Sequence, residues 1–457
     1  MRYVPTTPAE REAMLRAIGV RSVDDLFADV PERVRLRRPL RLRPALSDPE
    51  LLRYLAELAE RNGHADRLRC FVGAGAYDHF VPPAVWQLAG RGEFLTAYTP
   101  YQAELMQGEL QAAYEYQTMV CELLGMEVAN ASMYDGASAL GEAVVMARDL
   151  TRRDRVVVSQ AVHPEYRQVL RTYTEPLGVR VAELRSEGGV TPPEAGAVDG
   201  RIAAVVVQHP NFFGCLEDLR GWAEIAHRAG ALLVVACADP LAFGLLAPPG
   251  ELGADIVAAE DQPLGNPLNF GGPFLGIIAT REAFVRRMPG RLVGATVDSR
   301  GRRGFVLTLQ TREQHIRREK ATSNICTNEA LNALAAAIYL SLLGPEGVRR
   351  VAELCVRKAA YLKSLLAALP GFELAFAAPT FHEFVVRTPR PASAVVRTMA
   401  REGFLAGLPL GRFYRGMRDG LLVCVTETRT REEMDEFVEV LGRVAAPRLR
   451  AVGGRTR

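Results

Sequence analysis

Lysine is nearly absent from this chain of 457 residues. Only Lys320, Lys358 and Lys363 are lysines among its 56 basic residues, and all the others are arginines. A lysine amine forms a Schiff base with a carbonyl group, whereas the permanently protonated guanidinium of arginine does not. Any chemistry that depends on such a covalent bond therefore has three candidate residues in this chain.

Other absences exclude further classes of protein. The seven cysteines form no C-x-x-C pair, so we expect no zinc or other metal site and no redox dithiol, only buried thiols in a reducing compartment. No apolar run approaches the ~20 residues that cross a membrane, and the start, MRYVPTTPAEREAML, has no apolar signal core. The sequence thus predicts a cytoplasmic protein that does not span a membrane.

Neither sign of charge is in large excess. The net charge is +3 with both signs mixed along the chain, which gives no reason to expect nucleic acid as a partner. With 48% hydrophobic and 24% charged residues the composition is ordinary for a globular protein, and the length suggests two or three domains. All the charged residues in 446–457 are basic, and we expect this segment to form a solvated tail.

The pattern of apolar residues predicts three further regions. Residues 1–65 read as a helical arm with an extended arginine-rich stretch, RVRLRRPLRLRP; a small helical domain is the alternative. Residues 66–320 read as a large α/β domain, and residues 321–445 as a linking helix followed by a small α+β domain. Continuous apolar runs predict a mainly parallel sheet in the large domain, with strands at 155–160, 179–184, 202–208, 231–237, 254–259 and 274–279.

Polar residues follow several of these strands, at the edge where α/β proteins collect ligands. His163 could stack on an aromatic ring or be an ordinary loop residue, and His209 and Asn211 follow a later strand. Asp239 could hold the proton of a pyridine-type ring nitrogen, or could be a turn acid. The sequence leaves these alternatives open.

A turn at Asp135 precedes a predicted helix that contains Ser138. Free N–H groups at a helix start attract phosphate, but the charge of Asp135 opposes an anion there. The alternative is that Asp135 or Ser138 simply caps the helix.

A second candidate surface lies before another long helix. Tyr98, Thr99, Tyr101 and Gln102 surround Pro100 in a predicted loop. Polar aromatic residues in a loop are typical of a binding surface, and packing into the core is the competing interpretation. Spacing alone does not separate the two.

Several stretches together resemble one protein family. The chain is similar, nearly end to end, to the glycine cleavage system P-protein, the glycine decarboxylase, and most of all to the separate alpha subunit found where that protein is split in two. The resemblance is carried by FVGAGAYDHFVP (71–82), TAYTPYQAELMQGELQAAYEYQTMVCELLGMEVANASMYDGASAL (96–140), VQHPNFFG (207–214), QPLGNPLNFGGPFLG (262–276) and REKATSNICTNEAL (318–331).

This resemblance implies a fold and a reaction. The fold is that of the pyridoxal-phosphate-dependent transferases, the aspartate-aminotransferase-like fold type I. In the family, glycine loses carbon dioxide on pyridoxal phosphate, and the aminomethyl group passes to the lipoyl arm of the carrier H-protein. A beta subunit of the P-protein, expected in an alpha2beta2 assembly, is the implied partner.

The resemblance also locates the residue that should anchor the cofactor. That lysine would fall at position 262, where this chain has Gln262. Lys358 and Lys363 lie on a predicted amphipathic helix with solvated heads, and Lys320 lies outside the strand–loop context of the site. The resemblance therefore implies that the beta subunit binds the cofactor covalently and that this chain keeps only a vestigial pocket, with positions Asp135, Ser138, His163, His209, Asn211, Asp239 and Gln262.

Two classes of function follow. The first is a subunit of glycine decarboxylase that forms no Schiff base, is inactive alone, and directs Tyr98, Thr99, Tyr101 and Gln102 toward the partner's site or the substrate channel. The second is an independent or scaffold protein on the same fold without a covalent cofactor.

Overall fold

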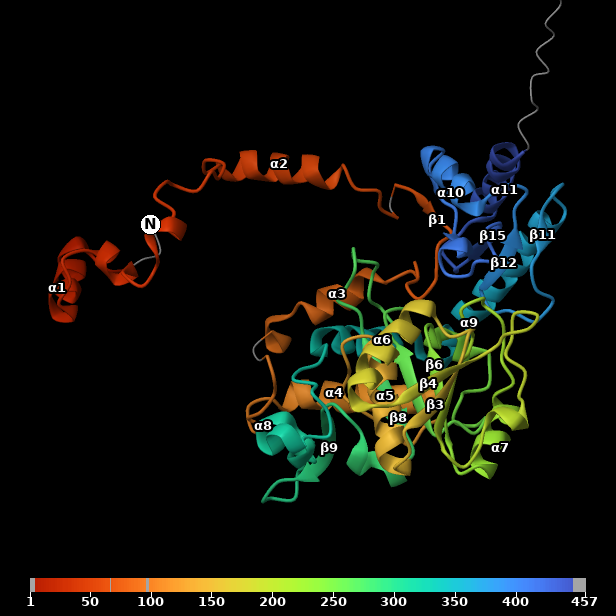
Figure 1. Cartoon of the computed structure of the whole chain (residues 1–457), viewed down its shortest axis with the longest axis horizontal. Coiled ribbons are helices and arrows are strands. Elements are labelled where there is room, and N and C mark those ends of the chain that lie inside the picture. The colour runs from red at the N-terminus through yellow and green to blue at the C-terminus, as the bar shows by residue number, and fades with distance from the viewer. Residues whose placement is uncertain (1–4, 66, 96–97, 447–457) are drawn as a thin grey trace, which may run out of the picture. The chain divides into compact units, whose positions relative to one another are not determined.

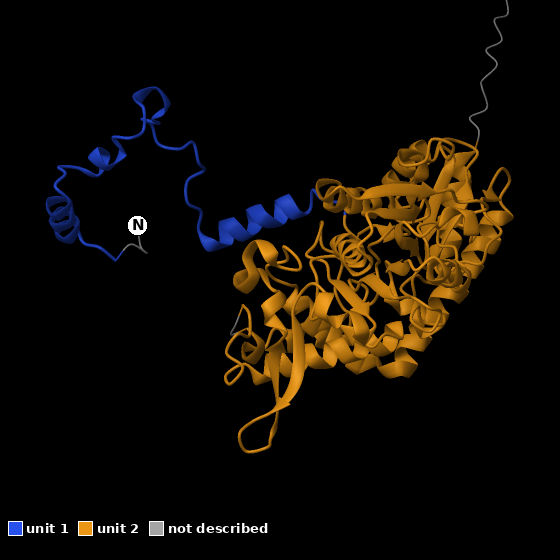
Figure 2. Ribbon diagram, turned by 60° about the horizontal axis from the view of Figure 1, so that its bottom comes forward, with its two compact units in different colours: residues 1–63 blue, residues 64–457 orange. Residues whose placement is uncertain are grey.

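The computed structural model describes residues 5–65, 67–95 and 98–446. Contacts divide the chain into two units, residues 1–63 and 64–457, which Figure 2 colours separately. The further boundaries that the sequence suggests, at 320 and 445, stay predictions. The basic tail lies outside the described residues from 447 onward.

The first unit contains short helices and no buried residue within them. Its 11-residue helix α1 begins after Thr7, whose hydroxyl accepts the Glu10 N–H. At the start of α2 the Glu50 carboxylate accepts the Ser47 N–H at 2.8 Å. Both interpretations of this region, an arm and a small helical domain, stay predictions. The elements are α1 (Pro8–Ile18), η1 (Val23–Phe27), η2 (Glu32–Val34) and α2 (Asp48–Ala59).

A seven-stranded sheet is the centre of the second unit. Its order is β2-β8-β7-β6-β5-β3-β4; the strands from β3 to β7 run parallel, and β8 pairs antiparallel with β7 and β2. The strands are β2 (Val128–Ala129), β3 (Arg155–Ser159), β4 (Arg180–Leu184), β5 (Ile202–Gln208), β6 (Leu232–Cys237), β7 (Ile256–Glu260) and β8 (Gly276–Thr280). Each predicted apolar run of the large domain forms one of these strands.

Helices cover both faces of the sheet, which is why its inner strands are largely apolar, whereas the edge strand β4 is only partly buried (Figure 1). Alternate residues of β3 enter different cores: Val157 joins one cluster with α7 and α9, and Val156 and Val158 join another with α5 and α6. The helices of this region are α3 (Pro83–Ala89), α4 (Gln107–Leu124), α5 (Gly136–Thr151), α6 (Pro164–Thr174), α7 (Leu219–Arg228) and α9 (Ala330–Ala367).

A smaller antiparallel sheet of four strands follows α9, in the order β11-β12-β15-β14. The two-residue strand β1 (Arg69–Cys70) pairs in parallel with β13 (Phe404–Leu405), and the two form a separate two-stranded sheet. The remaining elements are β9 (Leu292–Val297), β10 (Arg303–Thr308), α8 (Gln314–Arg317), β11 (Glu373–Leu374), β12 (Glu383–Arg387), α10 (Ala392–Arg401), β14 (Leu408–Pro409), β15 (Gly420–Cys424) and α11 (Arg431–Ala445).

Helix α9 is an exception to the expectation that no apolar segment approaches the length that crosses a membrane. By length and mean hydropathy it is the one described helix that could cross a membrane. Its backbone is not continuous, since Gly344 has non-helical angles and Pro345 follows. Its first half packs in the core of the large sheet, where Ala335, Ala336 and Tyr339 are buried. Core packing therefore accounts for its apolar composition.

Candidate functional site

Four neighbouring parallel strands bring the predicted pocket residues to one edge of the large sheet. Strands β3, β5, β6 and β7 lie side by side, and His163, His209, Asp239 and Gln262 follow their carboxyl ends in that order. A further segment, residues 73–80, contacts this edge, and we call it the plug. The plug makes hydrogen bonds or ion pairs with three of the four residues, as the contacts below show.

Gln262 is buried and fully hydrogen-bonded. Its side-chain oxygen accepts the Tyr77 N–H at 2.9 Å, and its amide nitrogen donates to the carbonyls of Tyr77 at 3.2 Å and Asn266 at 2.6 Å. An amide nitrogen is not a nucleophile, and both polar atoms here are already paired with backbone. Gln262 therefore holds the plug in place and cannot form a Schiff base.

Carboxylates occupy the start of helix α5, where a phosphate would need free N–H groups. Asp135 accepts the Ser138 N–H at 2.6 Å, and the Ser138 hydroxyl accepts the Asp135 N–H at 3.2 Å, which is a capping box. Glu260 accepts the Gly136 N–H at 2.9 Å. Of the two alternatives for this turn, the structure therefore supports the cap. Burial raises the pKa of Glu260 to about 8 despite its backbone hydrogen bonds.

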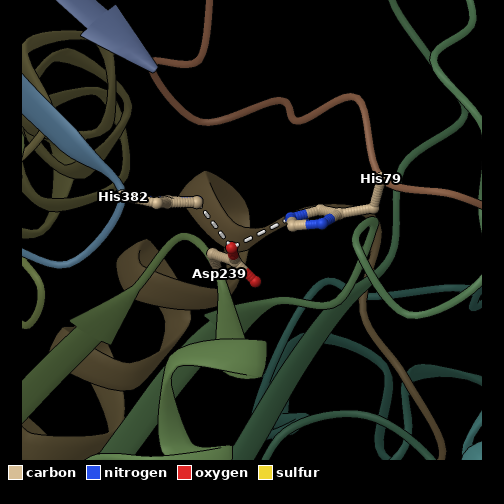
Figure 3. A group of neighbouring side chains, drawn as sticks. All are labelled: His79, Asp239 and His382. Carbon is tan, nitrogen blue, oxygen red and sulfur yellow. Dashed lines mark hydrogen bonds and ion pairs between the residues drawn. The ribbon is translucent and has the colours of Figure 1, made fainter. Parts of the chain in front are cut away.

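Asp239 is enclosed by two histidines that come from distant parts of the sequence (Figure 3). Its Oδ2 atom lies 3.1 Å from Nε2 of His79 and 2.7 Å from Nε2 of His382, and its Oδ1 atom accepts the Leu241 N–H at 3.0 Å. The other ring nitrogen of His79 lies 2.7 Å from Glu427. Asp239 is thus both the turn acid and a buried ion-pair partner. Both of its carboxylate oxygens already have partners, so neither is available to a cofactor ring nitrogen.

Opposite charges inside this cluster act against the effect of burial. Burial alone would lower the pKa of His79, but the carboxylates of Glu427 and Asp239 raise it to about 10. Burial alone would raise the pKa of Asp239, but the charges and hydrogen bonds of His79 and His382 lower it well below its usual value. His79 is therefore an imidazolium held between two carboxylates at neutral pH.

His163 is hydrogen-bonded to the plug and to the start of its own helix. Its Nε2 lies 2.8 Å from the Ala74 carbonyl, and its Nδ1 accepts the Glu165 N–H at 3.1 Å. Because Nε2 donates to the carbonyl and Nδ1 accepts, the ring carries its proton on Nε2. Burial lowers the pKa of the ring. Both contacts are made by ring nitrogens in the plane of the imidazole, so a role of His163 in stacking on a cofactor ring stays a prediction.

His209 and Asn211 make hydrogen bonds that hold the loop after β5. The His209 ring accepts the Glu217 N–H at 3.1 Å, and burial lowers its pKa to about 4. The Asn211 amide donates to the Gly189 carbonyl at 2.8 Å and to Glu217 at 2.7 Å. None of these contacts reaches the plug, so Asn211 organises its own loop.

His79, Asp239 and His382 also form a donor set that a transition metal could accept. A tetrahedral zinc ion with bonds of about 2.0–2.1 Å would hold its ligand atoms roughly 3.3 Å apart. The separations of 2.7 and 3.1 Å from Asp239 are those of direct ion pairs. Direct ion pairing accounts for the short separations in the cluster, and the absence of a metal site stays a prediction.

The lysines correct a second expectation. Lys358 donates to the Glu427 carbonyl, and Lys363 donates to the Thr380 hydroxyl at 3.0 Å, so neither head is simply solvated. Both bind loops beside the small sheet. Lys320 is exposed in a short 3-10 helix, Arg318–Lys320.

The second candidate surface is exposed, as a binding surface requires. Tyr98 is 78% and Tyr101 55% exposed, and Gln102 is also exposed, so these side chains do not pack in the core of this chain. Thr99 is partly buried, and its hydroxyl oxygen has no hydrogen-bond partner among the described residues. A role in a partner's site stays a prediction.

Arg291, which the sequence did not single out, connects this surface to two other family motifs. Its guanidinium donates to Asn328 Oδ1 at 2.7 Å, to the Cys326 carbonyl at 2.9 Å and to the Tyr101 hydroxyl at 3.4 Å. Asn328 in turn donates to Ser132 at 2.8 Å. The stretches TAYTPYQ, NASMY and SNICTN therefore meet at one buried arginine, whose Nε has no partner within the described chain.

A surface cavity of about 450 Å³ opens beside Arg291. Tyr98, Pro100, Leu331 and Asn328 are among its lining residues. Its walls are mainly apolar, and Glu109, Glu329, Arg291 and Asn328 are polar groups among its lining that could fix an orientation. This cavity is open to solvent, whereas the plug covers the edge of the large sheet.

The fold and its sheet-edge pocket define the class of the protein. The chain has fold type I, the fold of the pyridoxal-phosphate-dependent enzymes, with a mainly parallel central sheet. A glutamate decarboxylase of Lactobacillus brevis shares this fold with a TM-score of 0.68 at 14% identity, covering 92% of this chain and 97% of its own. The chain belongs to the glycine cleavage system P-protein family, whose model matches residues 1–441.

Close relatives agree over nearly the whole length. Proteins named probable glycine dehydrogenase (decarboxylating) subunit 1 from Desulforamulus reducens and Desulfitobacterium hafniense are 52% and 53% identical, over 97% of this chain and 100% of theirs. A crystal structure of glycine decarboxylase (P-protein) of the glycine cleavage system, in inhibitor-bound form, matches with a TM-score of 0.89 at 50% identity. It covers 97% of this chain and 100% of that chain.

The pocket of this chain does not fit pyridoxal phosphate. The cofactor needs a lysine for the Schiff base, a helix start that is free to bind phosphate, and a carboxylate that faces its ring nitrogen. Here Gln262 replaces the lysine, Asp135 and Glu260 fill the helix start, and His79 covers Asp239. No catalytic step can be derived through this pocket.

Proposed function

We propose that this chain is the subunit of glycine decarboxylase that does not anchor the cofactor. One observation carries the proposal: Gln262 stands, buried and fully bonded, at the position where the family resemblance places the lysine. The names of the relatives, subunit 1, support a second subunit. That partner, the beta subunit, binds pyridoxal phosphate covalently and pairs with this chain as alpha2beta2.

The reaction is the decarboxylation of glycine with transfer of the aminomethyl group to the lipoyl arm of H-protein. Pyridoxal phosphate supplies the electron sink for the departing carboxylate. This chain contributes a fixed surface: Arg291 holds Tyr101 and the loop at Asn328 beside the open cavity. Tyr98, Tyr101 and Gln102 are exposed there and face the partner's site or the substrate channel.

The alternative of a free-standing enzyme finds no support, because the plug fills the pocket that such an enzyme would use. A scaffold without any part in turnover is the alternative that needs an experiment. Substitutions on the exposed surface separate the two, since a scaffold should tolerate them.

We expect Tyr101→Phe and Gln102→Ala to lower turnover of the reconstituted complex by about 5- to 150-fold, which corresponds to the ~1–3 kcal/mol of one well-placed polar contact. Both residues are exposed, so the melting temperature of the isolated chain should hardly change. Turnover and melting temperature are measured on the same preparations.

Gln168→Ala is the matched control, because Gln168 is an exposed glutamine on helix α6, away from the three meeting motifs. It should leave turnover unchanged. Normal turnover in both Tyr101→Phe and Gln102→Ala would contradict the site assignment. A loss of turnover that follows a loss of melting temperature would leave only a packing role.

A further inference from the structure

The plug is tied to the large sheet at three points. The Ala74 carbonyl lies 2.8 Å from His163, the Tyr77 backbone exchanges two hydrogen bonds with Gln262, and His79 pairs with Asp239. Each partner follows the carboxyl end of a different strand, β3, β7 or β6. The plug therefore covers the edge of the sheet where a ligand would bind.

The same segment is tied to the small sheet. Glu383, the first residue of β12, accepts the Ala74 N–H at 2.6 Å and the Tyr77 hydroxyl at 2.9 Å. Glu427, which follows β15, accepts the Phe80 N–H at 2.7 Å as well as the His79 ring. Both carboxylates are buried or nearly so, and in the low-dielectric interior such charge-assisted bonds are the strong ones.

The backbone of the plug fits too closely to be a loosely placed loop. A Cβ atom added at Gly73 would lie 2.3 Å from the Glu383 carboxylate. Gly75 has a φ of +97°, and an added Cβ would lie 3.2 Å from the His163 ring. Glycine permits the close approach at position 73 and the positive φ at position 75, and Ala74 between them also has a positive φ of 60°, so the sequence GAG suits this path of the chain.

We propose that the plug is a built-in replacement for the cofactor: it pairs with the groups that would hold pyridoxal phosphate and permanently joins the two sheets across the pocket. The His79 imidazolium takes the place of a protonated ring nitrogen beside Asp239. The pocket consequently admits no pyridoxal phosphate, even without a covalent bond. This inference is independent of the reaction proposed above, because it concerns the isolated chain.

One test restores the missing lysine. We expect Gln262→Lys, incubated with pyridoxal phosphate and reduced with borohydride, to carry no label at residue 262, as mapped by mass spectrometry of its peptides. The wild-type chain is the control for labelling at Lys320, Lys358 and Lys363. Stoichiometric labelling at residue 262 would show that the pocket is accessible and would overturn the proposal.

A second test needs no substitution in the pocket and so does not depend on that variant folding. In the wild-type chain, the amide hydrogens of Ala74, Tyr77 and Phe80 should exchange with solvent as slowly as those of the core strands. Millimolar pyridoxal phosphate should leave the exchange unchanged. Fast exchange that the cofactor slows would show that the plug opens for a ligand, and fast exchange that the cofactor does not change would show that the plug joins nothing; either result overturns the proposal.

A matched pair of variants tests the link to the small sheet. Glu427→Gln removes the charge that binds His79 and Phe80, and it should speed the exchange of the plug amides by about tenfold or more. Glu439→Gln, an exposed glutamate on helix α11, should not. Equal exchange in the two variants would show that the plug is not held from the small sheet and would overturn that part of the proposal.

Discussion

Assayed without a partner, this chain is expected to catalyse neither the decarboxylation of glycine nor the exchange of the glycine carboxyl group with bicarbonate. The reason is chemical: Gln262 has no nucleophilic nitrogen, and Asp239 is already paired with His79. Added beta subunit should restore both activities. The measurement is release of labelled carbon dioxide, and incorporation of labelled bicarbonate, from each subunit alone and from the mixture.

The mixture serves as the control for the quality of the protein, because it contains the same preparation of this chain that is assayed alone. Activity near that of the complex from this chain alone would contradict the proposed function. Such a result would leave open how the plug behaves, which the exchange and labelling experiments decide separately.

The second large effect concerns stability. We expect His79→Ala to lower the free energy of unfolding by about 3–5 kcal/mol near pH 6.5, because it leaves Asp239 and Glu427 buried without their shared cation. His227→Ala is the control. That histidine is 2.8 Å from Asp255 but 40% exposed, so its loss should cost about 1 kcal/mol or less. Denaturant melts of both variants provide the comparison.

The pH dependence of the same comparison has a definite sign. The folded pKa of His79 is about 10 against 6.5 in the unfolded chain, so its stabilisation is complete below pH 6.5 and is lost as pH rises toward 10. The difference between wild type and His79→Ala should shrink over that range. The titratable groups around the ring are Tyr77, Asp239, Cys355, His382 and Glu427.

Acids elsewhere in the core do not disturb this comparison. Burial raises the pKa of Glu260 to about 8 and of Asp261 to about 7, so wild type and variant both lose stability as pH rises through those values. That common loss cancels in the difference. An equal cost for His79→Ala at pH 6.5 and pH 10, or a cost no greater than that of His227→Ala, would contradict the buried imidazolium.

Much of the fold could be predicted because its strands are continuous apolar runs. A strand that is buried on both faces is apolar on both sides, so β3, β5, β6, β7 and β8 fall where the sequence places them. The position of Gln262 just after β7 could be predicted for the same reason. The capping by Asp135 was one of two alternatives, and only the contacts with Ser138 and Gly136 decide between them.

The plug could not be predicted, because its contacts join segments that are far apart in the sequence. His79 and Asp239 are separated by 160 positions, and Tyr77 and Glu383 by 306. The stretch FVGAGAYDHFVP carried a family signal but no pattern that says where it lies. Arg291 was missed for a similar reason: an arginine before an apolar strand looks ordinary until Tyr101 and Asn328 are seen beside it.

The central claim is that this chain shapes a site whose covalent anchor belongs to its partner, and the scarcity of lysine makes it directly testable. The active complex is reduced with borohydride, which fixes the cofactor to the lysine that holds it, and the peptides are mapped by mass spectrometry. We predict one labelled lysine in the beta subunit and no label on Lys320, Lys358 or Lys363 of this chain. Stoichiometric label on any of these three lysines, appearing as activity is lost, would contradict the claim.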